Sequence, residues 1–135
     1  MLFRSETIYN TILPLNIKNV KIFCKDYLTY IPDHKYDLII GNPPFYVMKK
    51  ESVEKTYYPY FEGRPNIFIL FIIKSLQLLN DNGILSFILP KNFLNCLYYN
   101  KTRKYIYDNY KIIDIIDCTD KYVETYQEKI GRAHV

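Results

Sequence analysis

The stretch Tyr36-Asp37-Leu38-Ile39-Ile40-Gly41-Asn42-Pro43-Pro44-Phe45 decides the fold of this chain. Its first part, residues 36–40, is an apolar run that follows a proline-containing loop, a pattern typical of a parallel strand buried on both faces. Its second part is a rigid turn, because each of the two consecutive prolines holds φ near about −65°. We therefore expect a buried strand whose carboxyl end presents an amide, two ring-locked residues and an aromatic side chain.

This turn carries the groups that are needed to activate an exocyclic amino group such as that of adenine. Such a nitrogen is a poor nucleophile, since its lone pair is delocalised into the ring, and hydrogen-bond acceptors must draw it toward tetrahedral geometry. Asn42 offers its side-chain oxygen and Pro43 its backbone carbonyl, and the prolines aim both acceptors before substrate arrives. Phe45 offers a face for stacking a base that has left the duplex. The simpler alternative is an ordinary turn after a strand, because Gly, Asn and Pro dominate turns.

Strand and helix patterns alternate along the chain. Strands are predicted over 18–24, 36–40, 84–89 and 111–117, helices over 65–79 and 100–110, and a turn over 80–83. This order favours an α/β fold with a parallel sheet. Ligands of such sheets bind at the carboxyl ends of the strands, which is where Asp26 and Asn42 fall.

Composition narrows the class of protein. With 49% hydrophobic residues in 135, the chain is one domain or part of one. The longest apolar run, 67–73, is far shorter than the ~20 residues of a membrane span. Cys24, Cys96 and Cys118 are widely separated and have no metal-ligand spacing, so we expect reduced thiols, no metal site, no membrane association and a cytoplasmic location.

Five segments occur in the order seen in DNA adenine-N6 methyltransferases, and the chain most resembles the restriction–modification branch with an Asn-Pro-Pro-Tyr or Asn-Pro-Pro-Phe loop. The segments are Asp26-Tyr27-Leu28, Asn42-Pro43-Pro44-Phe45, Asn66-Ile67-Phe68, 83–94 and 120–125. The resemblance implies a Rossmann-like fold that transfers a methyl group from S-adenosylmethionine to N6 of an adenine flipped out of double-stranded DNA. It implies neither a metal nor a covalent enzyme intermediate.

The resemblance also implies a role for each matching residue. Asp26 would accept a hydrogen bond from the adenine amino group of the cofactor, and Tyr27 would line the same pocket. Asn42, which also borders the cofactor, would hold the target base together with Pro43 and Phe45. Pro44 would fix the loop.

Some parts of the family pattern are missing from this sequence. Its glycines, Gly41, Gly63, Gly83 and Gly131, form no glycine-rich cofactor loop. The aromatic segment that flanks the target base from the other side should begin near 122–128. We therefore expect an incomplete methyltransferase sheet that lacks the N-terminal strand carrying the glycine-rich loop.

The two ends of the chain match translated sequencing adapter. Residues 1–5 and 129–135 can be encoded by the two orientations of a common short-read adapter, so we expect residues 6–128 to be a partial methyltransferase catalytic domain. The net charge is +4, and Arg4, Lys129 and Arg132 supply three of those charges. The remaining balance gives little support to a basic nucleic-acid patch.

Two alternative functions stay open. A methyltransferase acting on a glutamine side-chain amide or on guanine N2 would need the same pair of acceptors. A catalytically inert, aggregation-prone fragment with negligible affinity for S-adenosylmethionine is the alternative from another class.

Overall fold

The computed structural model describes residues 2–118. Three predicted segments lie outside this range: the match at 120–125, the flanking aromatic segment at 122–128 and residues 129–135, which are predicted to be translated adapter. The chain divides into two compact units, residues 1–34 and residues from Lys35 onward. Each unit is described by itself.

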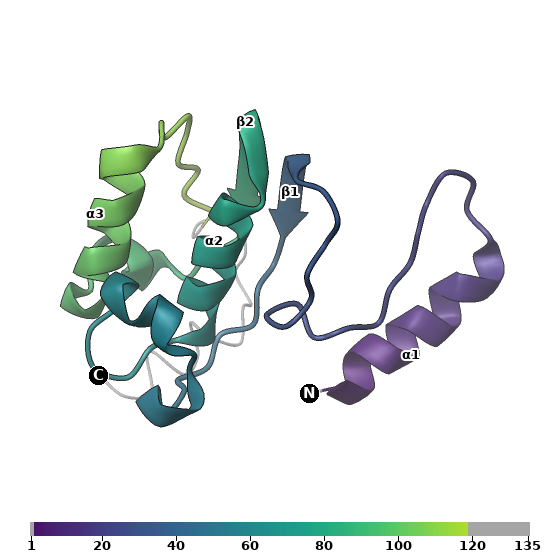
Figure 1. The fold of residues 1–135 in the computed structure, drawn as a ribbon, viewed down its shortest axis with the longest axis horizontal. Helices are drawn as coiled ribbons and strands as arrows, with labels where there is room; N and C mark the ends of the chain where they lie inside the picture. Colours follow the sequence, from purple (N-terminus) through teal and green to yellow (C-terminus); the bar gives the residue numbers. More distant parts are fainter. Residues whose placement is uncertain (1, 119–135) are drawn as a thin grey trace. The chain divides into compact units, whose positions relative to one another are not determined.

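The second unit contains a parallel two-stranded sheet. Its strands are β1 (Tyr36–Gly41) and β2 (Leu79–Phe87), which lie side by side in Figure 1. The predicted strands at 36–40 and 84–89 and their parallel arrangement are thus confirmed. Gly41 pairs with Phe87, so the carboxyl ends of both strands meet at one edge.

The prediction that β1 is buried on both faces is wrong within the described residues. Leu38 and Ile40 are 56% and 70% exposed, whereas the intervening Ile39 is half-buried. Alternate residues of a strand point to opposite faces. Helix α2 (Ile67–Gln77) packs against β2, and the face that carries Leu38 and Ile40 stays open in the described part of this unit.

The turn predicted at 80–83 falls inside β2 and interrupts its pairing with β1. Tyr36 pairs with Leu79, but Leu38 pairs with Ile84, so the register shifts across the turn. A Cβ atom on Gly83 would lie 2.9 Å from the carbonyl oxygen of Asn80 and 3.0 Å from that of Tyr36. Only glycine allows this close approach of the two backbones.

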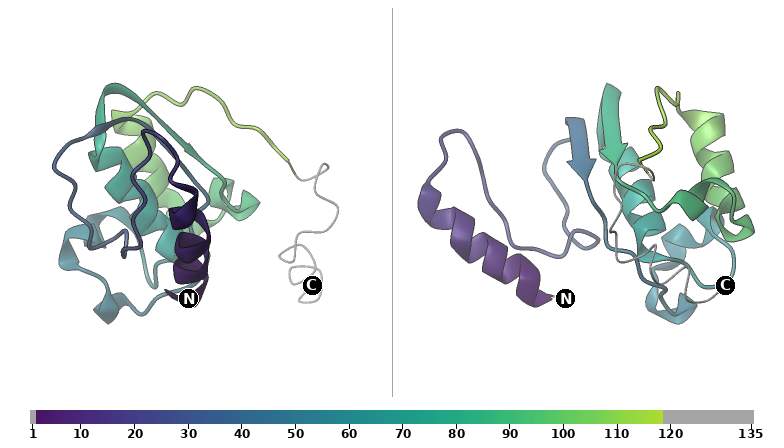
Figure 2. Two further views of the ribbon diagram at one scale, coloured as in Figure 1. Left: turned by 90° about the vertical axis from the view of Figure 1, so that its right-hand side faces the viewer. Right: turned by 180° about the vertical axis from the view of Figure 1, so that it is seen from behind.

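Two helices confirm the predictions at 65–79 and 100–110. They are α2 and α3 (Asn100–Asn109), and α3 lies farther from the strands than α2 does (Figures 1 and 2). Between the regular elements the chain forms short 3-10 turns: η2 (Lys50–Ser52), η3 (Lys55–Tyr60), η4 (Lys91–Leu94) and η5 (Leu97–Tyr99). Helix α2 supplies most of the core: Ile67, Phe68, Ile69, Leu70, Ile72, Ile73 and Leu76. No helix within 2–118 is long and apolar enough to cross a membrane.

The predicted strands at 18–24 and 111–117 are wrong. Both segments are irregular in the structure, although their apolar residues alternate or cluster. Ile113 and Ile116 are 71% and 72% exposed. A strand exists through hydrogen bonds to a neighbouring strand, and neither segment has such a neighbour among the described residues. An apolar sequence pattern alone does not supply one.

The first unit contains one α-helix, α1 (Leu2–Ile12), followed by the 3-10 turn η1 (Leu13–Leu15). Left-handed residues then reverse the chain: Asn16 has φ 45° and Asn19 has φ 63°. The segment continues irregularly to a turn at Asp26, where the amide of Tyr30 donates to the Asp26 carbonyl at 2.9 Å.

Because of Tyr105 on α3, we expect the stability of the second unit to decrease at alkaline pH. Its ring lies 4.7 Å from that of Tyr60, and burial, followed by a hydrogen bond with the Tyr110 hydroxyl, raises the pKa of Tyr105 to about 12. An unfolded tyrosine titrates near about 10. The pKa of Tyr105 is thus higher in the folded chain than in the unfolded chain. Its contribution to stability is fully present at pH values below the unfolded-state pKa, and it is lost as the pH rises through the folded-state pKa.

We therefore expect the urea midpoint of unfolding to fall between about pH 10 and pH 12, and to fall less in Tyr105→Phe. Denaturation followed by circular dichroism measures this dependence. Tyr107→Phe is the matched control on the same helix, because Tyr107 is 80% exposed. Identical pH dependence in Tyr105→Phe and Tyr107→Phe would contradict the assignment.

Candidate active site

The carboxyl end of β1 presents an available amide. Gly41, the last residue of the strand, accepts a hydrogen bond from the Ile88 amide at 3.1 Å. The next residue, Asn42, is exposed, and its side chain makes no hydrogen bond within residues 2–118. The Asn42 oxygen is therefore free to accept a hydrogen bond from a ligand at the edge of the sheet where parallel strands place their ligands.

The loop that follows Asn42 is anchored at its far end as well. Val47 forms an antiparallel bridge with Asn66. The amide of Ile67 donates to the Tyr46 carbonyl at 2.9 Å, and the amide of Met48 donates to the Pro65 carbonyl at 2.8 Å. With the β ladder on one side and this bridge on the other, the intervening residues are held without regular structure of their own.

The prolines and Phe45 differ in exposure along this loop. Pro43 is buried, whereas Pro44 and Phe45 are half-buried. The Phe45 ring packs edge-on against Phe68 of α2, with ring centroids 5.8 Å apart and planes at 90°. This contact fixes one side of the ring and leaves part of Phe45 open to solvent.

Phe68 connects Phe45 to two further rings. Its centroid lies 5.8 Å from that of Phe93 and 5.2 Å from that of Tyr99, and Phe93 and Tyr99 are 5.8 Å apart. We call Phe45, Phe68, Phe93 and Tyr99 the aromatic cluster. Burial raises the pKa of the Tyr99 hydroxyl above its ordinary value.

The sequence did not predict how the side chain of Asn66 is placed. This residue occupies the N-cap position of α2, where asparagine ordinarily bonds a backbone amide, yet its side chain makes no cap hydrogen bond. Its Oδ1 atom is buried and has no partner among the described residues. In the sequence, an asparagine directly after Pro65 predicts an N-cap. It does not predict that the Asn66 side-chain oxygen is buried.

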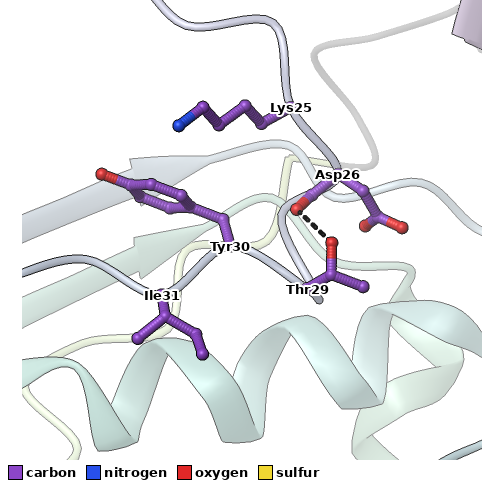
Figure 3. Close-up of a pocket in the computed structure, with 5 residues that line it drawn as sticks. All are labelled: Lys25, Asp26, Thr29, Tyr30 and Ile31. Atoms are coloured by element: carbon purple, nitrogen blue, oxygen red, sulfur yellow. Dashed lines mark hydrogen bonds between the residues drawn. The ribbon is translucent and has the colours of Figure 1, made fainter.

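Asp26 stands at the rim of an open pocket in the first unit (Figure 3). The pocket is lined by Lys25, Asp26, Thr29, Tyr30 and Ile31. The Asp26 Oδ1 atom accepts a hydrogen bond from the Leu28 amide at 2.9 Å, and the Asp26 backbone carbonyl accepts one from the Thr29 hydroxyl at 3.3 Å. These contacts hold the side chain through Oδ1 and do not involve Oδ2.

The structure brings together the four residues of the predicted catalytic loop, Asn42 to Phe45, at one end of the sheet. Asp26 and Tyr27 belong to the other unit, and their relation to Asn42 stays a prediction. Tyr27 is half-buried and is not among the residues that line the Asp26 pocket. Within residues 2–118 there is no cluster of His, Cys, Asp and Glu side chains that could hold a metal ion.

Comparison with known proteins identifies the family. The profile of the Eco57I restriction-modification methylase family matches residues 5–123, which is most of the chain. The chain belongs to this family. Membership confirms the resemblance to restriction–modification methyltransferases that the Asn42–Phe45 loop and its flanking segments indicate.

Curated relatives in this group are type II methyltransferases and modification methylases. The chain is 35% identical over 88 residues to the type II methyltransferase M.BstVI of Geobacillus stearothermophilus, covering 62% of this chain and 16% of that protein. It is 34% identical over 107 residues to the modification methylase CviBIII of Paramecium bursaria Chlorella virus NC1A, covering 76% and 28%. The chain thus spans less than a third of the length of either relative.

Proposed function

We propose that the protein containing this segment is a site-specific DNA methyltransferase that transfers a methyl group from S-adenosylmethionine to adenine N6. The observation that carries the proposal is the free, exposed amide of Asn42 on a loop anchored at both ends. An acceptor carried on an anchored loop needs less reorganisation as charge develops in the transition state, which lowers the barrier. The family of restriction-modification methylases supports the same chemistry.

The loop residues activate the amino group by accepting its two N–H hydrogens. The Asn42 oxygen accepts one and the Pro43 carbonyl accepts the other, so the nitrogen becomes more tetrahedral, and its lone pair is less delocalised into the ring and can attack. Phe45 stacks on the base, which must be out of the duplex to be reached. When bound, S-adenosylmethionine supplies an electrophilic methyl group on sulfonium. Pro44 limits rotation of the loop while the nitrogen gains the methyl group, the carbon–sulfur bond breaks to leave a neutral thioether, and the nitrogen releases its proton to water.

The first unit contains a hydrogen-bond acceptor that would suit the adenine end of this cofactor. An exocyclic amino group needs an acceptor, and Asp26 has a carboxylate that is oriented through Oδ1 and keeps Oδ2 outside the described hydrogen bonds. Tyr30 and Ile31 line the same open pocket, where the Lys25 ammonium lies 5.0 Å from the Tyr30 ring centroid and the Asp26 carboxylate is turned away from both side chains in Figure 3. Asp26 would hold the cofactor, with Tyr27 next to it in sequence.

Analysis of the methylated product formed by the full-length enzyme would identify its substrate. The enzyme is incubated with methyl-labelled S-adenosylmethionine and either double-stranded DNA or a glutamine-containing protein extract, and the labelled product is digested and separated. We expect label in N6-methyladenine. Label in N2-methylguanine or in methylglutamine would assign the loop to the alternative substrates, and the absence of any labelled product would favour the inert alternative.

Replacing Phe45 tests the stacking role. Phe45→Ala should lower turnover about tenfold or more, whereas Phe45→Tyr and Phe45→Trp should largely preserve it, because stacking uses the ring face and is worth about 1–3 kcal/mol per base. Fluorescence of 2-aminopurine placed at the target position reports extrusion of the base. An unchanged fluorescence signal in Phe45→Ala would contradict stacking on this ring.

A further inference from the structure

The loop over residues 91–96 lies beside the predicted catalytic loop in the topology of the sheet. It follows β2, whose carboxyl end is at the same edge as that of β1. It contains the 3-10 turn η4 and is closed by short-range bonds, from the Phe93 amide to the Pro90 carbonyl and from the Cys96 amide to the Asn92 carbonyl, both 2.9 Å. Bonds of this kind define the local turns. They do not fix the position of the loop relative to the rest of the unit, which therefore depends on other contacts.

One side chain of α3 supplies these contacts. The Nη1 atom of Arg103 donates to the Phe93 carbonyl at 2.7 Å and to the Cys96 carbonyl at 2.8 Å, and Nη2 bonds the side-chain oxygen of Asn100. Hydrogen bonds from a guanidinium are roughly twice as strong as those between neutral groups. The planar guanidinium holds Nη1 between the two carbonyls while Nη2 bonds Asn100, a three-point arrangement that a flexible lysine ammonium would not reproduce.

The neighbouring residue anchors α3 to a different segment of the chain. Thr102 is fully buried, and its hydroxyl donates to the Tyr60 carbonyl at 2.7 Å, at the end of η3. This bond contributes to the packing of α3 on η3 and does not involve the 91–96 loop. Consecutive residues of α3 thus bind two different loops.

The restraint on the 91–96 loop extends to Phe45 through ring contacts. Arg103 holds the backbone of Phe93, the Phe93 ring packs on Phe68 at 5.8 Å, and Phe68 packs on Phe45 at the same distance. Phe93 is 8% exposed and Phe68 fully buried, so neither ring can move far without displacing the other.

From this chain of contacts, and on the basis of the proposed function, we propose that Arg103 is a positioning residue for the target base. By holding the backbone carbonyls of Phe93 and Cys96, it keeps the aromatic cluster in the arrangement that orients the Phe45 ring. Its described hydrogen bonds go to Phe93, Cys96 and Asn100, so it would act on the base through Phe45 and not by direct contact. A side chain that only stabilised α3 would have no effect on the Asn42–Phe45 loop.

Two variants on neighbouring positions separate these roles in the full-length enzyme. Arg103→Met removes the guanidinium but keeps an unbranched side chain, and Thr102→Val removes the anchor to Tyr60 without changing the shape of the side chain. Hydrogen exchange is followed at residues 91–96 and at the Met48 and Ile67 amides, which close the catalytic loop. Turnover, the Kd for S-adenosylmethionine and 2-aminopurine fluorescence are measured at a temperature where every variant is folded.

We expect Arg103→Met to speed exchange in both segments and to lower turnover, each by about tenfold, because the lost hydrogen bonds come from a charged donor and are stronger than bonds between neutral groups. The Kd for the cofactor should stay unchanged and the 2-aminopurine signal should decrease. Thr102→Val should lower the melting temperature and leave exchange at Met48 and Ile67, turnover and fluorescence at wild-type values.

Faster exchange confined to residues 91–96, with wild-type turnover and fluorescence in Arg103→Met, would overturn the positioning role and leave the proposed function intact. Absence of methylation by the wild-type enzyme would overturn the proposed function, while the exchange rates would still decide the link from Arg103 to the catalytic loop. If Arg103→Met does not fold, Arg103→Lys takes its place. Its expected values lie between wild type and a full loss, and wild-type values at every readout would overturn the proposal.

Discussion

Asn42→Ala in the full-length enzyme is expected to lower turnover about 10²–10³-fold, the loss found when a single preorganised transition-state hydrogen bond is removed. The amide is free in the structure and follows directly on β1, so its removal takes away an acceptor without disturbing the ladder or the bridge that anchor the loop. Steady-state kinetics with a duplex substrate measure the turnover. The Kd for S-adenosylmethionine should change little, since the lost bond is made to the target amino group.

Asn42→Asp is the matched variant, because aspartate keeps an acceptor oxygen at the same place. It should retain more turnover than Asn42→Ala. Asn109→Ala is the control for loss of an exposed asparagine, since Asn109 lies on α3 and bonds only the Tyr105 carbonyl in the described contacts. Turnover in Asn42→Ala close to that of Asn109→Ala would show that Asn42 does not bind the amino group.

Phe68→Ala is expected to destabilise the second unit by about 3–5 kcal/mol, as removal of a large core ring does. Phe68 is fully buried on α2 and contacts the rings of Phe45, Phe93 and Tyr99, so the cavity would be lined by aromatic groups that have little room to close it. Because domains are stable by only about 5–15 kcal/mol, the variant should be largely unfolded at moderate urea concentrations.

Equilibrium urea unfolding followed by circular dichroism measures this loss. Phe68→Leu should cost less, because a leucine fills part of the space. Tyr107→Ala is the control, since it removes a ring of α3 that is 80% exposed. A loss in Phe68→Ala no larger than that in Tyr107→Ala would mean that the aromatic cluster contributes little to stability.

The exposed face of the sheet is relevant to the alternative that the chain is a catalytically inert, aggregation-prone fragment. Leu38, Ile40, Ile84 and Ile88 are between 46% and 70% exposed. Contiguous apolar surface of this kind favours association or aggregation when it stays uncovered. The expectation that the chain alone is aggregation-prone and binds S-adenosylmethionine negligibly stays a prediction, and light scattering together with calorimetry on purified protein would test it.

Features set by neighbouring residues could be predicted from the sequence alone. The strand at 36–40, the second strand at 84–89 and the helices at 65–79 and 100–110 follow from apolar period and from proline and glycine positions, and all are present. The rigid turn after β1 follows from Pro43 and Pro44, because a proline restricts its own φ whatever surrounds it. The family could be recognised for the same reason, since its main motif is local.

Features that depend on a partner distant in sequence were decided only by the tertiary structure. The segments 18–24 and 111–117 have strand-like patterns but no neighbouring strand among residues 2–118, so their sequence pattern alone did not predict their structure. The inward side chain of Asn66, the packing of Phe45 on Phe68, and the hydrogen bonds from Arg103 to two carbonyls of another loop join residues across turns and helices. A hydrogen bond or a ring contact needs both partners placed within a few tenths of an ångström, and local preferences do not determine that placement.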